Sequence, residues 1–251
     1  MKLSVITVSL NSQETIAATA RSVCEQSYPD IEYLVIDGGS CDGTLTQLAP
    51  YREKIATVLS EPDRGLYDAM NKGLALATGE VVGFLHADDQ YADREVLARV
   101  AAVFATGTID ACYGDLVYVD ACHPNRVTRS WRAGQLTRRK LYFGWMPPHP
   151  TFFVRRQWYR QYGGYRLDLG TAADYELMLR YLLRHRLQAA YLPYLLVSMR
   201  SGGASNRSLN SRLQAHAMDW KAWLVNGLLP YPWTVPCKPL RKVKQWYRSR
   251  S

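Results

Sequence analysis

Two adjacent carboxylates, Asp88 and Asp89, stand directly after an apolar run of the chain at residues 81–85. Divalent cations such as Mg²⁺ bind carboxylate oxygens together with the phosphate oxygens of a substrate. A cation held at this position could neutralise the negative charge that develops on a departing diphosphate. The alternative is that both side chains only cap the helix that follows the apolar run.

Asp37 ends a second apolar run, residues 33–36, and opens the turn DGGS. A carboxylate there can accept hydrogen bonds from a nucleobase or a ribose, and the two glycines let a ligand approach the backbone closely. The segment matches neither the GxxxxGK[ST] phosphate loop nor the GxGxxG pattern. The alternative is a plain strand–turn–helix connection in which Asp42 belongs to the turn or caps the next helix.

Two further polar residues lie on predicted helices. Lys72 follows Asp68 by four residues within residues 66–77, so the two side chains share one helix face. Lys72 could pair with a diphosphate as a point charge, or form a solvated ion pair with Asp68. Asp174 stands near the start of residues 172–185, where the helix dipole favours an acid, and the same residue type can act as a general base for a sugar hydroxyl.

Apolar runs and helical stretches alternate over the first 105 residues, which predicts an α/β fold with a mostly parallel, doubly wound sheet. Strands are expected at residues 3–10, 33–36, 55–60 and 81–85, and helices at 13–26, from 43, at 66–77 and at 94–105. In such sheets ligands bind beyond the carboxyl ends of the strands. Asn11, Asp37 and Asp88 each follow a predicted strand closely, so we expect them at one rim.

The second half of the chain has a less regular pattern. Residues 112–150 are rich in Arg, Trp, Tyr, Gly and Pro, and they predict an irregular flap or acceptor region. Short strands are expected at 151–154 and 189–192, and a helix at 206–225. Four prolines between residues 230 and 239 predict an irregular segment there.

The 251 residues are 47% hydrophobic and 21% charged, which is ordinary for a globular protein of one large α/β domain. The net charge is +9, and it would fall to +2 without the cations that follow Asp219, the last acidic residue. These seven cations are Lys221, Lys238, Arg241, Lys242, Lys244, Arg248 and Arg250. They alternate with Trp220, Trp223, Leu224, Leu228, Leu229, Trp233, Trp246 and Tyr247. This pattern favours an anionic membrane surface as a partner, with aromatics packed on the core and solvated cations as the alternative.

The compartment is predicted from the cysteines and from the hydropathy of the chain. Five cysteines form no CxxC pair, and an odd number of this kind indicates reduced thiols in a cytoplasmic protein. The first ten residues are followed at once by polar ones, so they indicate a buried strand and not a signal peptide. No apolar run reaches transmembrane length. The basic tail further favours peripheral association of the protein with the inner face of the cell membrane.

Taken together, the motifs resemble family 2 glycosyltransferases of the GT-A fold, especially bacterial enzymes of capsule, exopolysaccharide and O-antigen assembly. The segments that carry the resemblance are SVITVSLNS, YLVIDGGSCDGT, EPDRGLYDAMNKGLALATGE, VVGFLHADD, and more loosely HPTFFVRR and AADYELMLR. They extend over about 200 residues and leave the tail outside. The expected organisation is therefore a GT-A domain at residues 1–205, Rossmann-like with a sheet flanked by helices, and a helical, basic and aromatic extension at residues 206–251.

The resemblance implies a nucleotide-binding role for three residues. Asp37 would contact the nucleobase, commonly uracil, while Asn11 lies in the nucleotide-facing first loop and Lys72 lies near the nucleotide. The resemblance also implies that Asp88 coordinates Mn²⁺ or Mg²⁺ on the donor diphosphate, with Asp89 beside it. The expected donor is a nucleotide-sugar, and a UDP-sugar is favoured.

The reacting end of the site follows from the same resemblance. Asp174 matches the position of the catalytic base, and His149 lies in a segment near the acceptor or the leaving group. The implied reaction is a single in-line displacement that inverts the anomeric configuration and transfers the sugar to a glycan or lipid-linked acceptor. Surface polysaccharide or glycolipid assembly is the implied context.

Two departures from the family pattern stand out. His86 replaces the first aspartate of the commoner DADD motif. That aspartate makes the usual ribose contact, so the replacement puts this contact and the preference for one nucleobase in question. The QxxRW motif is absent, which argues against a processive synthase.

A sugar-phosphate nucleotidyltransferase is an alternative, but the loop SLNSQE after the first strand lacks the glycines and lysine of that class. A nucleic-acid-binding module using the tail is a second alternative, for which no motif speaks, so no nucleic acid is expected as a partner.

Overall fold

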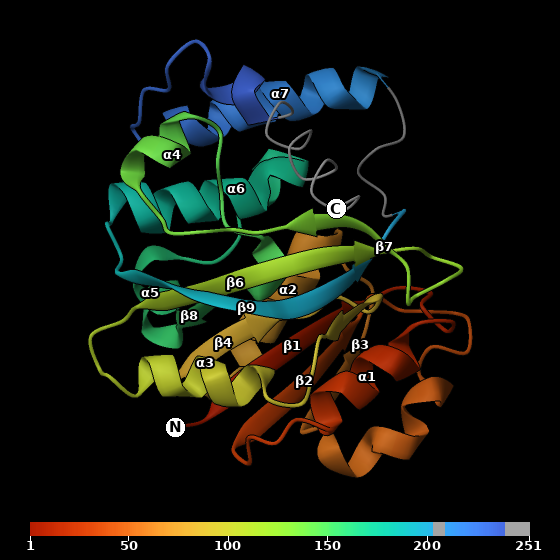
Figure 1. Ribbon diagram of the computed structural model, residues 1–251. Coiled ribbons are helices and arrows are strands. Elements are labelled where there is room, and N and C mark those ends of the chain that lie inside the picture. The colour runs from red at the N-terminus through yellow and green to blue at the C-terminus, as the bar shows by residue number, and fades with distance from the viewer. Residues whose placement is uncertain (203–208, 239–251) are drawn as a thin grey trace.

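The computed structural model describes residues 1–202 and 209–238, and these residues form one curled sheet with helices on both faces (Figure 1). Within the described residues the strand order is β3-β2-β1-β4-β8-β6-β9-β5, and β7 pairs with β6 at the side. The strands of the first half are β1 (Leu3–Ser9), β2 (Ile31–Asp37), β3 (Thr57–Ser60), β4 (Val81–Phe84) and β5 (Asp89–Tyr91). Those of the second half are β6 (Ala111–Val119), β7 (Val127–Trp131), β8 (Phe153–Arg155) and β9 (Ala189–Arg200).

The first four strands confirm the parallel arrangement that the alternating pattern predicts. β1 pairs in parallel with β2 and β4, and β2 pairs in parallel with β3. The helices that connect these and later strands are α1 (Ile16–Cys24), α2 (Leu66–Leu76) and α3 (Val96–Phe104). The helix expected from residue 43 is instead the 3₁₀ helix η1 (Thr46–Lys54), because Pro50 within it has no N–H to donate to an α-helical ladder.

Residues 112–150 were expected to be irregular, and for much of this stretch that expectation is wrong. β6 pairs in parallel with β9 and antiparallel with β8, and it forms an antiparallel ladder with β7. A short helix, α4 (Arg138–Tyr142), follows. Gly114 and Asp115 interrupt the apolar pattern of β6, and its main partner, β9, lies more than 70 residues away along the chain, so local periodicity carried no signal for it.

The core lies on both faces of the sheet. Every residue of β1 is buried, as expected for a strand inside a parallel sheet. Leu3 and Val5 pack on the face covered by α1 and α3, while Ile6 and Val8 pack on the face covered by α2. The sheet is therefore held rigidly from both sides, and its strand ends form a fixed platform.

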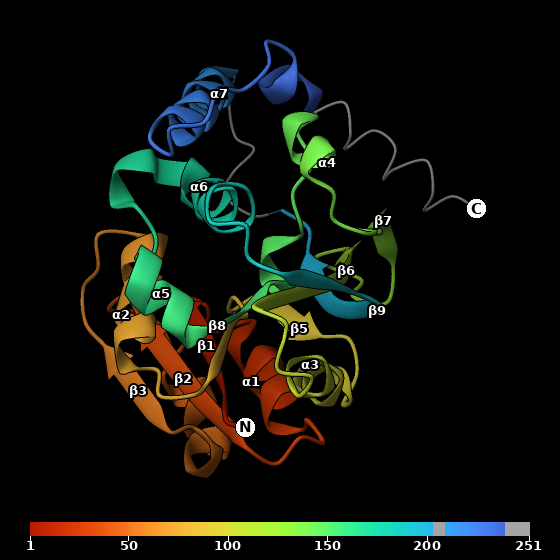
Figure 2. The same ribbon diagram turned by 90° about the vertical axis from the view of Figure 1, so that its left-hand side faces the viewer.

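The remaining helices pack on the face of the sheet that α2 also covers (Figures 1 and 2). They are α5 (Arg156–Tyr162), the 3₁₀ helix η3 (Leu167–Ala172), α6 (Ala173–Met178) and α7 (Leu209–Leu224). The helix expected at 172–185 is present, although its second half, Leu179–Arg184, is a π-helix. Residues 234–238 are helical in a segment expected to be irregular. The domain boundary expected at residue 205 lies outside the described residues.

Candidate functional site

The rim of the sheet brings together the polar residues that follow β1, β2 and β4. β1 lies between the other two strands, with Ser9 opposite Asp37 and Ile6 opposite Phe84. Because all three strands are parallel, their carboxyl ends meet at one edge. Asn11, Asp37 and the segment from His86 to Asp89 therefore lie along that edge, as the sequence predicts.

Asp37 is completely buried, and its carboxylate accepts five hydrogen bonds. Oδ1 accepts from the hydroxyls of Ser9 and Ser40, at 3.0 and 2.5 Å. Oδ2 accepts from the Ser60 hydroxyl at 2.7 Å and from the N–H groups of Gly39 and Ser40. Burial alone would raise the pKa of Asp37, but these hydrogen bonds outweigh it and hold the pKa below its usual range. The carboxylate thus organises the loop at the rim, and a nucleobase contact would compete with these donors.

Asp63 is a rim carboxylate that the sequence reasoning passed over. Its Oδ1 accepts a hydrogen bond from the Gly65 N–H at 2.8 Å. A Cβ atom added to Gly38 would lie 2.5 Å from its Oδ2, so only glycine at position 38 lets the side chain approach so closely. Its position in the segment EPDRG, between β3 and α2, was the available signal.

Asn11 joins the first loop to the loop that follows β2. It has a positive φ of 47°, its N–H donates to the Ser40 hydroxyl at 2.7 Å, and its side-chain oxygen accepts from the Cys41 N–H at 3.1 Å. A left-handed backbone is uncommon outside glycine, and asparagine is among the residues that tolerate it best. Asn11 therefore shapes the rim in the absence of any ligand.

Lys72 points to the loop that follows β3. Its Nζ donates to the Pro62 carbonyl at 2.8 Å and forms an ion pair with Glu61 at 2.8 Å. The alternative expectation of an ion pair with Asp68 is wrong, because Asp68 pairs with Arg64 at 2.8 Å. The positive charge of Lys72 thus lies beside the rim but is partly neutralised there.

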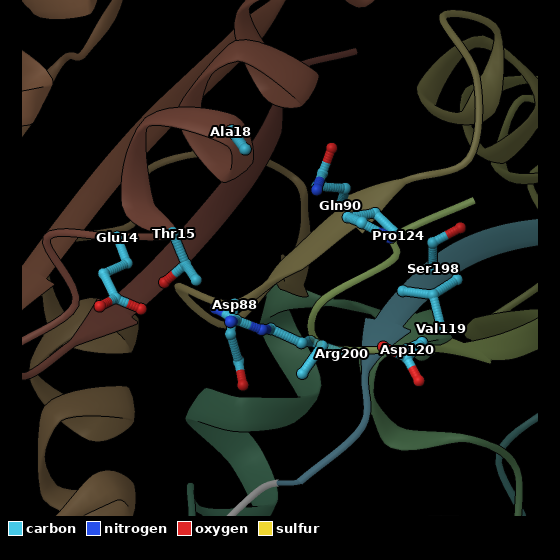
Figure 3. A pocket seen from close by; sticks show the side chains of 11 residues that line it. Glu14, Thr15, Ala18, Asp88, Gln90, Val119, Asp120, Pro124, Ser198 and Arg200 are labelled. Carbon is cyan, nitrogen blue, oxygen red and sulfur yellow. The ribbon is translucent and has the colours of Figure 1, made fainter. Parts of the chain in front are cut away.

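Asp88 is half-buried and lines a pocket of about 230 Å³ at the carboxyl end of the sheet (Figure 3). Glu14 and Thr15, just before α1, form one wall of this pocket, and Asp120 and Arg200 form the other. Arg200 ends β9, so the pocket joins the parallel half of the sheet to the second half. The carboxylate of Asp88 could bind a cation and the guanidinium of Arg200 could bind an anion. A pocket with both groups suits an anionic molecule that is bound together with a cation.

Asp89 differs from its neighbour because it is completely buried. Neither carboxylate oxygen has a side-chain hydrogen-bond partner among the described residues. Burial, with a smaller contribution from Asp88, raises the pKa of Asp89 well above its usual range. Among the described residues no group of three or more His, Cys, Asp or Glu side chains could hold a metal ion. A cation beside Asp88 would therefore need oxygen ligands from a bound molecule in addition to the side chains of the described residues.

Two imidazoles lie between the rim and the helices of the second half. The rings of His86 and His149 stack with their centroids 5.8 Å apart, and His149 Nε2 lies 2.8 Å from the Tyr165 hydroxyl. Burial lowers the pKa of each histidine to about 4, and for His86 the neighbouring His149 adds to this effect. Both rings are therefore neutral at pH 7, and they give the site a wall without charge.

Asp174 lies at the start of α6, and its charge and that of Asp88 both act on His86, so both carboxylates lie near this histidine. Its Oδ1 accepts from the Tyr175 N–H at 2.7 Å, and the Tyr67 hydroxyl also hydrogen-bonds to it. Burial raises the pKa of Asp174, while Lys238 and these hydrogen bonds act against burial without cancelling it.

Lys238 comes from the segment after α7 and was expected to be a free cation of the tail. Its Nζ instead lies 2.7 Å from Asp219 and 3.5 Å from the centre of the Tyr175 ring. It is the largest of the electrostatic influences that lower the pKa of Asp174. No local pattern pointed to this role, because Lys238 and Asp174 are far apart in the sequence.

Comparison with known proteins shows the family to which the chain belongs. Residues 4–163 match the model of the family described as glycosyl transferase family 2. An uncharacterized glycosyltransferase of Mycobacterium tuberculosis is 37% identical over 185 residues, which cover 71% of this chain and 68% of the relative. A PGL/p-HBAD biosynthesis glycosyltransferase of Mycobacterium bovis is 32% identical over 208 residues, covering 81% and 78%.

The chain belongs to glycosyl transferase family 2. Solved structures of GT-A glycosyltransferases share its fold. Residues 1–349 of Staphylococcus aureus TarS, in complex with UDP-GlcNAc, match with a TM-score of 0.67 and 21% identity, covering 87% of this chain and 65% of that one. A mannosyltransferase of Pyrobaculum calidifontis, in complex with GDP-Man and Mn²⁺, matches with a TM-score of 0.65 and 17% identity, covering 99% and 73%.

Membership of family 2 confirms the resemblance and the α/β GT-A fold expected from the motifs. It also favours glycosyl transfer over the alternative of a sugar-phosphate nucleotidyltransferase. For a family 2 glycosyltransferase, the structure brings four expected residues to one region, namely Asp88, Asp89, His149 and Asp174. Asn11, Asp37 and Lys72 form or adjoin the neighbouring part of the rim, where their side chains are engaged by other protein groups.

Proposed function

We propose that the protein is an inverting glycosyltransferase that transfers a sugar from a nucleotide-sugar to the hydroxyl of a glycan or lipid-linked acceptor. The observation that carries this proposal is that Asp174, half-buried and with a raised pKa, and Asp88 both lie near the neutral His86, on which both of their charges act. A UDP-sugar is the favoured donor. One structural neighbour binds UDP-GlcNAc and another binds GDP-Man, so the nucleobase of the donor has to be determined by experiment.

In the proposed reaction Asp174 accepts the proton of the acceptor hydroxyl. The hydroxyl oxygen forms a bond to the anomeric carbon while the bond from that carbon to the diphosphate oxygen breaks. Attack from the face opposite the leaving group inverts the configuration and releases the nucleoside diphosphate. A base whose pKa is raised by burial suits this task, because it binds the proton more strongly than a solvated aspartate does.

Asp88 would hold Mn²⁺ or Mg²⁺ together with the diphosphate oxygens of the donor. When bound, such a cation neutralises charge on the leaving group. Asp88 is the half-buried member of its pair, and Asp89 would stand beside it as a completely buried neighbour. The neutral rings of His86 and His149 would exclude water next to the reacting carbon without adding charge. Surface polysaccharide or glycolipid assembly is the proposed context, since a relative is a PGL/p-HBAD biosynthesis glycosyltransferase.

The test is a donor screen with two variants. Purified protein is incubated with UDP-, GDP- and dTDP-sugars and Mn²⁺ or Mg²⁺, and nucleoside diphosphate release is measured. We expect metal-dependent release from one donor, loss of that release in Asp88→Ala, and a fall of roughly 10²–10⁴-fold in Asp174→Asn with donor binding retained. Asp93→Asn is the matched control, because Asp93 is exposed and pairs with Arg99 away from the site.

Calorimetry of donor binding separates the possible failures. Near-normal turnover by Asp174→Asn would remove Asp174 as the base while leaving the activity intact. If no donor in the panel is bound or cleaved by the wild-type protein, the proposed donor class is wrong.

A further inference from the structure

The segment that follows α7 exposes large apolar side chains within a short stretch. The exposed fractions are 58% for Leu224, 78% for Leu229, 48% for Tyr231 and 46% for Trp233. Scattered apolar residues are normal on a protein surface, but a contiguous group of them marks a surface that meets a partner or a membrane. This group lies at the end of the molecule formed by α4 and the segment after α7 (Figure 2).

Ring contacts hold two members of this group, Tyr231 and Trp233, against the end of α4. The rings of Tyr231 and Trp233 stack at 4.9 Å, Trp233 lies 6.4 Å from Phe143, and Tyr231 lies 5.2 Å from Tyr142. The Thr234 hydroxyl donates to the Tyr142 carbonyl at 2.6 Å and anchors the segment. Tyr231 and Trp233 are therefore presented by a packed structure, so little conformational entropy would be lost when their side chains are covered.

Positive charge surrounds these aromatic rings. Arg138 and Arg139 of α4 are exposed, and the Arg139 guanidinium lies 5.6 Å from the centre of the Phe143 ring. Neither arginine forms an ion pair with a carboxylate of the described residues. The sequence that follows the described residues adds five more cations and no acid. Aromatic and aliphatic side chains beside arginine and lysine match the interface of a bilayer that carries anionic lipids.

This set of residues differs from the one expected from the sequence. Trp223 is completely buried, and its indole N–H donates to the Tyr175 hydroxyl at 2.9 Å. Lys221 pairs with Asp168 at 3.2 Å, and Lys238 pairs with Asp219. These three residues are therefore part of the folded body, while Trp246, Tyr247 and five of the tail cations lie outside the described residues.

The exposed surface and the proposed base are linked by one short segment. Lys238 follows Trp233 by five residues, and it lies on the ring of Tyr175, the neighbour of Asp174. A membrane at this end of the molecule would thus lie close to the start of α6. An acceptor anchored in that membrane would reach the site from this side.

We propose that Arg138, Arg139, Leu224, Leu229, Tyr231 and Trp233 form a docking surface for an anionic lipid bilayer. The bilayer would present a lipid-linked acceptor to the site that contains Asp174. Only this delivery of the acceptor rests on the proposed function, because binding to the bilayer does not require catalysis. Within the described residues no helix is both long and apolar enough to cross a membrane, and the proposed mode is binding at the interface.

The test is co-sedimentation of the full-length protein with vesicles of phosphatidylcholine alone and of phosphatidylcholine with phosphatidylglycerol. We expect binding to the second kind only, weakened by added salt. Leu229→Ser and Trp233→Ser should each weaken vesicle binding about tenfold or more, because each of these side chains would bury apolar area in the bilayer interface. Arg138→Gln and Arg139→Gln should each weaken it about fivefold at low salt.

Matched controls remove the same groups elsewhere. Leu76→Ser removes a leucine that is 41% exposed at the end of α2, and Arg126→Gln removes an exposed arginine between β6 and β7. Both controls should bind vesicles like the wild type. All variants are compared by circular dichroism and by Tm, so that a loss of folding is not taken for a loss of binding.

Several outcomes would overturn the docking surface. One is that the wild type binds neither kind of vesicle, and another is that the serine and glutamine variants bind as well as the controls. A third outcome is tested by sedimentation velocity without lipid. If the wild type self-associates and Trp233→Ser does not, this surface is an interface between two copies of the chain. Donor cleavage in free solution is expected to be unchanged in these variants, so failure here is distinguishable from failure of the proposed function.

Discussion

Asp174 illustrates how its surroundings give one residue its chemistry. An aspartate in the first turn of a helix is normally stabilised in its charged form by the helix dipole. Here burial acts in the opposite direction and raises the pKa, while Lys238, the Tyr175 N–H and the Tyr67 hydroxyl limit the rise. The side chain is consequently a stronger base than a solvated aspartate, yet it remains in contact with donors that keep it oriented.

The pH dependence of turnover follows from this balance. The proposed base, Asp174, must be deprotonated to act, so kcat should fall as the pH drops through its pKa, which lies above the ordinary value for an aspartate. Lys238→Met removes the cation that lowers this pKa, and the acidic limb should move to higher pH. Lys238→Arg keeps the charge and should leave the limb near its wild-type position.

Two measurements check this prediction. The first is the pH profile of donor turnover for the three proteins. The second is titration of the ¹³C-labelled aspartate carboxyl groups by NMR, which needs no substrate. An acidic limb and a carboxyl titration that are the same in Lys238→Met and in the wild type would show that Lys238 does not act on Asp174.

At the scale of elements, α6 is held in place by a buried ion pair. The Arg180 guanidinium contacts both Glu176 oxygens at 3.0 and 2.9 Å, and it also donates to the carbonyls of Tyr162, Gly163 and Gly164 after α5. Glu176 is 1% exposed. This one side chain thus joins the end of α5 to α6, the helix whose first turn contains Asp174.

Arg180→Met should lower the free energy of unfolding by about 3–5 kcal/mol, because it leaves the Glu176 carboxylate buried without a partner. Arg180→Lys should recover only part of this loss, since a single ammonium cannot reproduce the planar fork of the guanidinium. Urea denaturation measures both changes. Arg160→Met, at an exposed position on α5, should stay within about 0.5 kcal/mol of the wild type. A similar small change in Arg180→Met would show that this ion pair does not stabilise the fold.

At the scale of the whole molecule, the segment after α7 is packed onto the catalytic body. Gly144 has a φ of +72°, and a Cβ atom there would lie 2.7 Å from the Thr234 carbonyl oxygen and 2.8 Å from the Lys238 nitrogen. Glycine therefore allows the backbones of α4 and of the C-terminal segment to meet. This contact places Lys238 beside α6 and the exposed aromatic residues beside α4.

Gly144→Ala should displace the C-terminal segment, because the new methyl group meets backbone atoms that have no room to move. We expect faster hydrogen exchange in residues 231–238 and an acidic limb shifted as in Lys238→Met. Gly107→Ala is the matched control, since Gly107 has a φ of +78° and nothing within 4 Å of the added atom. Exchange measured by mass spectrometry would contradict the prediction if both variants behaved alike.

The parallel half of the fold was predictable from local sequence. Each of its strands is an apolar run followed by a turn, and the order of runs and helices implies the rim at which Asn11, Asp37 and Asp88 lie. The pairing of β6 with β9 was not predictable in this way, because Ala111 faces Ala189 and no short-range pattern links residues so distant in the sequence. The residues that carry the family resemblance lie mainly in the half that local patterns describe well.

The sequence alone determined the fold class, the family and the types of residue available at the rim. Only the tertiary structure decided that Asp37 is saturated with hydrogen bonds, that Asp89 is buried, and that Lys238 lies beside the proposed base. It likewise decided that Trp223 packs in the core while Trp233 is exposed. Periodicity and turn chemistry are local, so they can be read along the chain. Burial and pairing depend on which distant side chains come into contact. Residues of the same type therefore have different pKa values and different partners in the folded chain.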